Sequence, residues 1–325
     1  MFKTLRTALF GMGAFLLAGG LLTVPAQAAD YPTKPIQLVS PYGAGGDSDL
    51  TARVWAEFAK KKLGQPVVVV NKTGGGGLTG TLFAAKAKPD GYTLFLAQAG
   101  PNIIIPLTAK GANYGFESFD YVARIMLANC AVVAGKDAPW KDLKEFAEAA
   151  KKEPGKLVFA SPAATSWLTF AMRNWFTSAG VQVKIVEYKS GGEAATAVLG
   201  GHADMTFLFP QNYAPMASAD KLKILAIGTK SDVYPDAPTF AELGYEGNYY
   251  GWGGIAAPKG TPKEILDRIA AISAEIVKDP EYIKALHNMH ATPDYAVGEP
   301  WMKQLKEQYG EMNKVLTDLG LTANK

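Results

Sequence analysis

Residues 40–53 read SPYGAGGDSDLTAR, where a buried strand turns through Gly43, Gly45 and Gly46 into a helix. Glycine lets a ligand approach the backbone closely because it has no side chain. The first peptide N–H groups of a helix lack partners within it, and together with the helix dipole they attract an anion. The same pattern also fits an ordinary strand-to-helix loop in which an acidic or hydroxyl side chain caps the helix. The stretch therefore predicts an α/β fold and leaves a binding role open.

Apolar runs alternate with amphipathic stretches along most of the chain. Strands are expected at residues 36–40, 66–70 and 93–97, with helices at 49–63 and 78–87. A second series has strands at 131–134, 157–160, 183–186, 205–208 and 222–227, with helices at 140–152, 166–179 and 193–199. An extended segment at 249–257, a helix at 261–278 and a mainly helical tail at 280–319 follow. Two such series predict two lobes, each a mainly parallel sheet flanked by helices, with a cleft between them.

The tail has no sheet of its own, so we expect it to pack on the first lobe. The chain then crosses between lobes near residues 128–131 and 245–253. The predicted first lobe comprises residues 29–130 and 253–325, and the predicted second lobe comprises residues 131–252. Two crossings beside a cleft are typical of proteins that close on a ligand by a hinge.

The beginning of the chain, residues 1–28, predicts a secretory signal peptide. A short basic stretch precedes an apolar run over residues 8–24, which ends in an A-x-A pattern. We expect cleavage near Ala28 and a mature protein in the periplasm. An uncleaved membrane anchor is the alternative, although the run is short for a span and is interrupted by glycines.

The charge balance argues against a nucleic-acid partner. The chain has 33 basic and 30 acidic residues, and the signal segment holds Lys3 and Arg6 but no acidic residue. A near-neutral chain lacks the basic surface that nucleic acids need.

Cys130 is the single cysteine, which rules out an intrachain disulfide and a thiolate metal site. We expect a monomer without metal or cofactor.

A second glycine cluster, VVVVNKTGGGGLTG, contains a formal GxGxxG at Gly75, Gly77 and Gly80. Its context argues against a dinucleotide site, because several residues separate the strand from the first glycine. No acidic residue follows at the end of the next strand either, where a ribose partner is expected. We interpret the cluster as a glycine turn that is able to line a cleft.

Signatures of catalysis are missing from the sequence. Neither a GxSxG elbow nor a P-loop occurs. His287 and His290 are three residues apart on an expected helix without a third ligand, which favours a solvated helix face over a metal site. His202 has no nucleophile beside it, and Cys130 is interpreted as a small buried residue. The sequence therefore predicts binding rather than turnover.

The second lobe offers further polar groups at strand ends. Ser161, Thr165 and Ser166 lie between a strand and a helix, and residues 190–192 form another such turn. Capping of the helices explains the hydroxyls equally well. Asp204 either buttresses the cleft or fixes its own turn, and we favour the turn.

Arginine is scarce in the part of the chain after the signal segment. Only Arg53, Arg124, Arg173 and Arg268 occur there. A cleft that holds a carboxylate would therefore rely on backbone N–H groups, hydroxyls and water.

The number, order and spacing of these motifs resemble one family. The landmarks are YPTKPIQLVSPYGAGGDSDLTAR, GQPVVVVNKTGGGGLTG, KPDGYTLFLA, YKSGG, GGHADM, YPDAPTFAELGY and GWGGIAAPKGTP. Over nearly the whole mature chain they are similar to the substrate-binding proteins of tripartite tricarboxylate transporters, the Bug proteins. The resemblance implies a two-lobed periplasmic-binding-protein fold of type II. It also implies a carboxylate ligand and delivery to a permease with two integral membrane subunits.

The resemblance further implies which residues bind the ligand, from the glycine loops of the first lobe and three segments of the second. The candidates are Tyr42, Gly43, Ala44, Gly45, Gly46, Asp49, Asn71, Gly76, Gln98, Ser161, Ala164, Thr165, Ser166, Tyr188, Gly191, Gly192, Asp204 and Phe207. Where the family often has a GSxGxGS-like turn, this chain has SPAATSWL. Trp167, Tyr188 and Phe207 then form either an aromatic wall or part of the core, and core packing is the simpler interpretation.

The expected function is capture of a small organic acid, a di- or tricarboxylate or an aromatic carboxylate, for uptake. An extracytoplasmic sensor that presents its ligand to a signalling partner is the alternative, and an NAD-dependent enzyme is a remote one.

Overall fold

A computed structural model describes residues 31–162 and 166–323 of the chain. The predicted signal segment, residues 1–28, and the candidate residues Ala164 and Thr165 lie outside the described residues. From Pro32 onward the chain forms one unit that contains two β-sheets. Among the described residues, no helix is both long and apolar enough to span a membrane.

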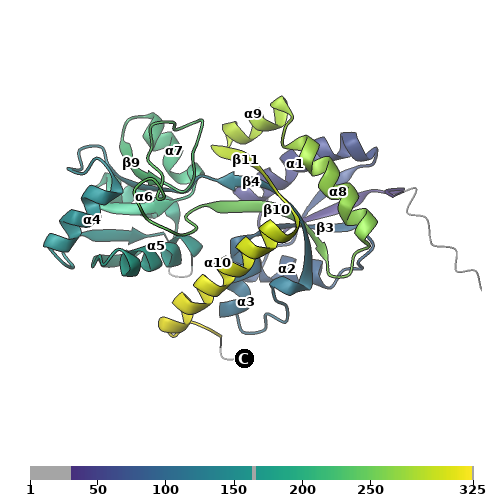
Figure 1. Ribbon diagram of the computed structural model, residues 1–325, viewed down its shortest axis with the longest axis horizontal. Coiled ribbons are helices and arrows are strands. Elements are labelled where there is room, and N and C mark those ends of the chain that lie inside the picture. Colours follow the sequence, from purple (N-terminus) through teal and green to yellow (C-terminus); the bar gives the residue numbers. More distant parts are fainter. Residues whose placement is uncertain (1–30, 163–165, 324–325) are drawn as a thin grey trace, which may run out of the picture. The chain divides into compact units, whose positions relative to one another are not determined.

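The first sheet has six strands in the order β2-β1-β3-β10-β4-β11 (Figure 1). The strands are β1 (Ile36–Ser40), β2 (Val67–Asn71), β3 (Thr93–Gln98), β4 (Phe119–Ala128), β10 (Gly251–Pro258) and β11 (Ala291–Ala296). Its helices are α1 (Asp47–Leu63), α2 (Leu78–Ala85), α3 (Ile105–Thr108), α8 (Lys263–Ile276) and α9 (Pro280–Asn288). Short turns η2 (Gly75–Gly77), η3 (Gly100–Ile104) and η4 (Phe116–Ser118) complete it. We call this part lobe 1.

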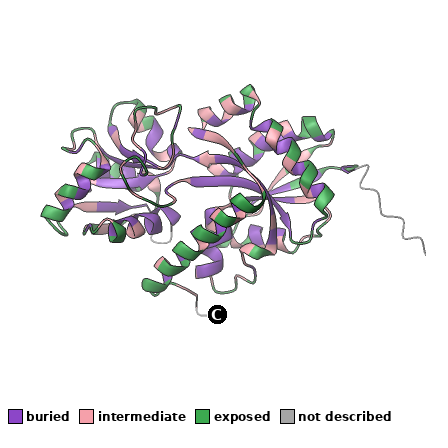
Figure 2. Ribbon diagram, viewed as in Figure 1, coloured by how far each residue is buried: buried purple, intermediate pink, exposed green. Residues whose placement is uncertain are grey.

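The second sheet has five strands in the order β7-β6-β8-β5-β9. They are β5 (Ala131–Gly135), β6 (Val158–Ser161), β7 (Lys184–Glu187), β8 (Met205–Leu208) and β9 (Leu222–Ile227). The helices α4 (Leu143–Lys152), α5 (Trp167–Ser178), α6 (Gly191–Leu199) and α7 (Pro210–Ser218) accompany them. We call this part lobe 2. In both lobes the strands are mostly buried and the helices expose their outer faces (Figure 2).

Both sheets are built on the same plan. Three parallel strands, β2-β1-β3 and β7-β6-β8, are followed by one antiparallel strand and then by another that returns to the first direction. The antiparallel strand is β10 in lobe 1 and β5 in lobe 2, and in each case the chain has just arrived from the other lobe. The two-lobed α/β fold is thereby confirmed. Each sheet is mixed, because the crossing strand runs against its neighbours.

The sequence did not indicate the strand β4, which is the longest of the first sheet. Arg124 interrupts its apolar run, and the structure shows why a charge is tolerated there: its guanidinium is paired with Asp294 and bonds Gln304. The strand β11 was also missed inside the tail predicted to be mainly helical. Pro293 lies within β11, which is an edge strand, the position where a sheet tolerates proline.

The last helix, α10 (Gly298–Asp318), packs on β4 of lobe 1 and on α5 of lobe 2. Its Trp301 is buried against Gly254 of β10, where an added methyl group would lie 2.5 Å from the indole. The tail thus contacts more than the first lobe, and the predicted lobe boundaries stay a prediction.

The crossing between β4 and β5 is anchored by Asn129, which is fully buried. Its amide nitrogen donates to Thr292 Oγ1 at 2.7 Å, and its backbone oxygen accepts from Tyr213 Oη at 2.7 Å. Thr229 donates to its side-chain oxygen. One residue therefore ties β11 of lobe 1 to α7 and the end of β9 in lobe 2.

Candidate cleft between the lobes

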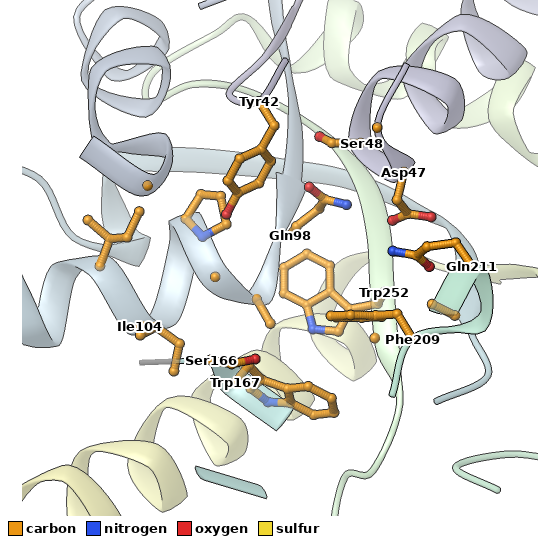
Figure 3. Close-up of a pocket in the computed structure, with 18 of the residues that line it drawn as sticks. Tyr42, Asp47, Ser48, Gln98, Ile104, Ser166, Trp167, Phe209, Gln211 and Trp252 are labelled. Atoms are coloured by element: carbon orange, nitrogen blue, oxygen red, sulfur yellow. The ribbon is translucent and has the colours of Figure 1, made fainter. Parts of the chain in front are cut away.

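A cavity of about 620 Å³ lies where the carboxyl ends of the parallel strands of both lobes meet the crossing strands. Figure 3 shows side chains of α1, β3 and η3 from lobe 1 facing Trp167, Phe209 and Gln211 from lobe 2. A cavity of this size suits a small organic molecule. It is the place in the fold where a ligand would contact both lobes at once.

The glycine turn after β1 is held by one carboxylate, that of Asp49. Its side chain is 2% exposed and accepts hydrogen bonds from Gly45 N at 2.8 Å, Arg53 Nε at 2.9 Å and Asn71 Nδ2 at 2.9 Å. Asn71 also donates to the backbone oxygen of Tyr42 at 2.9 Å. These bonds, led by that from Arg53, lower the pKa of Asp49 to about 2. The turn is therefore fixed by a charged network before any ligand arrives.

The helix that follows this turn has no side-chain cap. The N-cap of α1 is Gly46, which has no side chain to accept from the first N–H groups. Helix α2 likewise begins after Gly77 without a side-chain cap. Uncapped N–H groups need an acceptor from elsewhere, and in α1 those of Asp47 and Ser48 belong to residues that line the cavity. An anionic group is well placed to supply it.

Two glycines make room for the Tyr42 ring, which forms one wall of the cavity. A methyl group on Gly77 would lie 3.3 Å from the ring, and one on Gly100 would lie 3.0 Å from the hydroxyl. Burial raises the pKa of Tyr42 to about 12, so the hydroxyl stays protonated at neutral pH. The second glycine cluster thus acts mainly by letting an aromatic side chain close over it.

The opposite wall is aromatic. Trp167 and Phe209 come from lobe 2, with ring centroids 6.5 Å apart. Trp252 comes from the crossing strand β10, and its Nε1 donates to Gln308 Oε1 at 2.8 Å, which holds the indole in place. Among the described residues that line the cavity, none is a lysine, arginine or histidine. The lining is mostly apolar.

Asp47 and Gln98 also line this cavity. The Asp47 carboxylate belongs to the first residue of α1, and burial raises its pKa to about 6. Gln98 ends β3, and its side-chain oxygen is buried without a hydrogen-bond partner among the described residues. Figure 3 shows Asp47 and Gln98 on the same side of the cavity, with Gln211 of α7 reaching toward Asp47 from lobe 2.

Some candidate residues from the sequence line this cavity, and others support it. Tyr42, Gly46, Gly76, Gln98 and Ser166 are in the lining. The remaining residues of the first loop, Gly43, Ala44 and Gly45, are exposed beside it, while Asp49 and Asn71 bond the turn from behind. Their roles in binding stay predictions.

Other candidates lie elsewhere. Ser161 is fully buried, and its hydroxyl is 2.9 Å from that of Thr169. Tyr188 and Gly192 line a separate open hollow on lobe 2, beside Gly191 at the start of α6. These residues are not brought to the cavity between the lobes.

Asp204 and Phe207 are also away from the cavity. Asp204 lies before β8 at the amino end of the parallel strands, where its side chain accepts from Val158 N at 2.7 Å and so links the start of β8 to the start of β6. Phe207 is fully buried and packs against Trp167 and Phe240. The aromatic wall is therefore made by Trp167 with Phe209 and Trp252, rather than with Tyr188 and Phe207.

Sequence reasoning passed over much of the cavity. The missed residues follow β3 and β8 or belong to the crossing strands: Pro101, Ile104, Ile105, Thr108, Met126, Ala128, Phe209, Gln211, Gly251 and Trp252. A usable signal existed, because the segments after the carboxyl ends of parallel strands converge on one site. Both missed segments follow strands that the sequence predicted.

The cysteine and the two histidines that the sequence analysis weighed as catalytic or metal-binding residues are either buried or next to other side chains. Cys130 is fully buried, which raises the pKa of its thiol. His290 stacks on Tyr234, whose hydroxyl is 3.3 Å from Nδ1, and His287 lies 4.0 Å from Asp232. Within residues 31–162 and 166–323, no three His, Cys, Asp or Glu side chains gather as a metal site.

Comparison with known proteins gives a consistent result. A family model described as the tripartite tricarboxylate transporter family receptor matches residues 51–321. The UPF0065 protein in the gbd 5' region of Cupriavidus necator is 33% identical over 315 residues, covering 96% of each chain. The structure of the periplasmic binding protein BugD is 29% identical with a TM-score of 0.68, covering 90% of this chain and 99% of that one. MatC from Rhodopseudomonas palustris with bound malate is 25% identical with a TM-score of 0.66, covering 88% and 100%.

Proposed function

The chain belongs to the receptor family of tripartite tricarboxylate transporters, the Bug proteins, and from this premise we propose that it captures a small organic acid in the cleft for uptake. Members of this family are periplasmic solute-binding proteins. We propose export of this chain by its first 28 residues, ligand capture without turnover, and transfer of the ligand to an integral membrane permease.

One observation carries the proposal. The uncapped start of α1 borders a cavity of about 620 Å³ that both lobes line. A carboxylate placed there accepts hydrogen bonds from peptide N–H groups and meets the positive end of the helix dipole. Because the described lining contains no side-chain cation, these donors would bind the acid. The malate bound to MatC supports an organic acid as the ligand class.

Closure of the lobes would couple binding to delivery. Asn129 connects the lobes at the crossing, so rotation about this region would bring Trp167 and Phe209 toward the loop at Tyr42. A permease that recognises the closed form would then accept only the loaded protein. A sensor would use the same closed form, so the membrane partner distinguishes the two: cross-linking to native membranes yields permease subunits for uptake and a signalling protein for sensing.

A thermal-shift screen tests the ligand class. The purified protein is heated with aliphatic di- and tricarboxylates, aromatic acids and amino acids, and with neutral sugars as the comparison set. A true ligand at one hundred times its Kd stabilises the protein by about 2.7 kcal/mol, a rise in Tm of several degrees. A shift with sugars or inorganic cations alone would overturn the proposal.

A further inference from the structure

The charge of the cleft poses a question that capture of a simple acid does not answer. Asp47 is the one charged side chain in the described lining, and it is negative. A carboxylate held at the start of α1 would lie within about one helical turn of it, a spacing of about 5 Å at most. Two like charges at that separation in a half-buried site repel each other strongly. The ligand or the cleft must supply something that offsets this repulsion.

Asp47 is not used by the protein itself. Among the described residues it makes no hydrogen bond or ion pair, whereas its neighbour Asp49 makes three. If Asp47 capped α1, bonds from the helix would lower its pKa, but burial alone raises that pKa to about 6. Capping of α1 by hydrogen bonds therefore does not explain the residue.

Gln98, at the end of β3, also lines the cavity. The side-chain oxygen of Gln98 is buried and has no partner among the described residues, while the Gln98 backbone N–H donates to Asn102 Oδ1 at 3.0 Å. That oxygen is therefore not open to a ligand in the cavity, and Figure 3 shows the amide nitrogen of Gln98 on the side toward Asp47. Asp47 is thus the charged acceptor of the lining that a donor group of a ligand can reach.

We propose that the ligand carries an ammonium group next to its carboxylate, bound by Asp47, with a large apolar remainder against Trp167, Phe209 and Trp252. The ligand is thus an amino acid with a hydrophobic side chain or a close analogue. This inference rests on the proposed function of the cleft.

The chemistry of an ammonium group fits each of these contacts. It has three N–H donors and no acceptor, which matches a carboxylate to which no other group of the described residues donates. Aromatic rings around the site add a favourable cation–π attraction. Because the anion site and Asp47 both belong to the start of α1, the two charged groups of the ligand lie on neighbouring carbons. The apolar part of the cavity, with Ile104 and Pro101, then receives the side chain.

Matched ligand pairs test the inference. Calorimetry compares L-phenylalanine with 3-phenylpropionate and L-leucine with 4-methylpentanoate, which differ only in the amino group. At about pH 8, where Asp47 is ionised, the amino acid of at least one pair is expected to bind at least about tenfold more tightly than its partner. Asp47→Asn, which keeps the shape and removes the charge, removes this preference. Asp236→Asn, an exposed carboxylate of lobe 2, keeps it.

The pH dependence of ligand affinity is an independent test. Pairing with an ammonium group favours the ionised form of Asp47, so amino-acid binding weakens as the pH falls through about 6, and Asp47→Asn loses this dependence. The other groups near Asp47 are Tyr42, Cys130 and the Asp49–Arg53 pair. The pKa of each lies well outside the range from about 5 to 8 used in the titration.

The outcomes separate this inference from the proposed function. If the acid without an amino group binds as tightly, and binds better at low pH or in Asp47→Asn, then Asp47 acts as a protonated donor and the inference is wrong while acid capture stands. The same holds if other organic acids bind and neither pair does. If no carboxylate of any kind binds, the proposed function fails first.

Discussion

In both lobes a hydrogen bond between two hydroxyl groups links the end of the first parallel strand to the helix that follows, but the starts of the helices are capped differently. In lobe 1, Ser40 at the end of β1 bonds the hydroxyl of Ser48 in α1 at 3.2 Å. In lobe 2, Ser161 at the end of β6 lies 2.9 Å from the hydroxyl of Thr169 in α5. Each pair is buried and spans eight residues. The same bond pins each helix to the strand before it.

The difference lies in the helix starts. In lobe 2, Ser166 caps α5 by accepting from Leu168 N at 3.3 Å, and Ser190 caps α6 by accepting from Glu193 N at 3.2 Å. In lobe 1, Gly46 and Gly77 leave α1 and α2 without a side-chain cap. Helix α7 of lobe 2 also lacks one, but Pro210 at its first position removes a donor.

Lobes built on the same plan therefore present different groups to the cleft. Lobe 1 leaves the first N–H groups of α1 without a side-chain acceptor, after a turn that Asp49 holds in place, which prepares it for an anion at little cost in ordering. Lobe 2 satisfies most of its own donors and presents aromatic side chains. We therefore expect lobe 1 to determine whether an acid binds and lobe 2 to determine its apolar part.

The largest expected effect contrasts two phenylalanines of lobe 2. Phe207→Ala leaves a cavity in the core and should lower the free energy of unfolding by about 3–5 kcal/mol. Phe209→Ala should cost less stability and weaken ligand binding, because this ring borders the cleft. Denaturant unfolding and calorimetry measure the two. Weaker binding by folded Phe207→Ala at unchanged stability would place Phe207 in the cleft after all.

The next effect concerns the network in lobe 1. Asp49→Ala leaves the N–H of Gly45 without an acceptor and removes one of the two acceptors of the Asn71 amide, so we expect a loss of about 2 kcal/mol in stability and at least tenfold in affinity. Asp142→Ala is the matched control, since it removes the cap of α4 in lobe 2 at a cost of about 1 kcal/mol. Its affinity should be unchanged. Equal losses of affinity in both variants would mean that the turn is not specially prepared.

The Asp49 carboxylate also predicts how the free energy of unfolding decreases at acidic pH. The pKa of Asp49 is about 2 in the folded protein and about 4 in the unfolded chain, so its contribution is complete above pH 4 and is lost as the pH falls toward 2. Denaturant unfolding at several pH values should therefore show a shallower acid limb in Asp49→Ala than in the wild type. Parallel limbs would contradict the network.

A smaller effect comes from backbone strain at Gly45. Its φ is +80°, and a methyl group there would meet nothing within 4 Å. Gly45→Val should therefore strain the turn by about 1–3 kcal/mol without a clash and abolish measurable binding in a folded protein. Gly180→Val has a similar φ of +64° and equally open space in lobe 2, so it controls for strain alone. Retained affinity in Gly45→Val would remove this turn from the site.

The sequence predicted what depends on local pattern. The strand β1, the start of α2 and the strands β8 and β9 follow from apolar runs bounded by polar or glycine-rich turns. The strand β4 did not, because Arg124 is explained only by a partner 170 residues away. The glycine turn before α1 was likewise predictable, since it depends on neighbours in the chain.

The aromatic wall was not predictable in the same way. Trp167 begins a helix and Phe207 lies in a strand, and the residues around them in the sequence do not indicate which of the two faces the cavity. Trp167 lines it, whereas Phe207 packs behind it in the core. Trp252 reaches the cleft only because β10 crosses back from lobe 2. Such positions depend on how distant segments meet, which periodicity does not report.

The smallest expected effect returns to the paired hydroxyls. Ser48→Ala and Thr169→Val each remove one buried side-chain bond at the tip of a strand, so each should cost about 1 kcal/mol of stability. Only Ser48 borders the cleft, so only Ser48→Ala should also change ligand affinity. Denaturant unfolding and calorimetry on the two variants measure both quantities. Equal stability losses with unequal affinity losses would show that the lobes share their construction and divide their roles, whereas an affinity loss in Thr169→Val would show that lobe 2 also depends on its tip to bind.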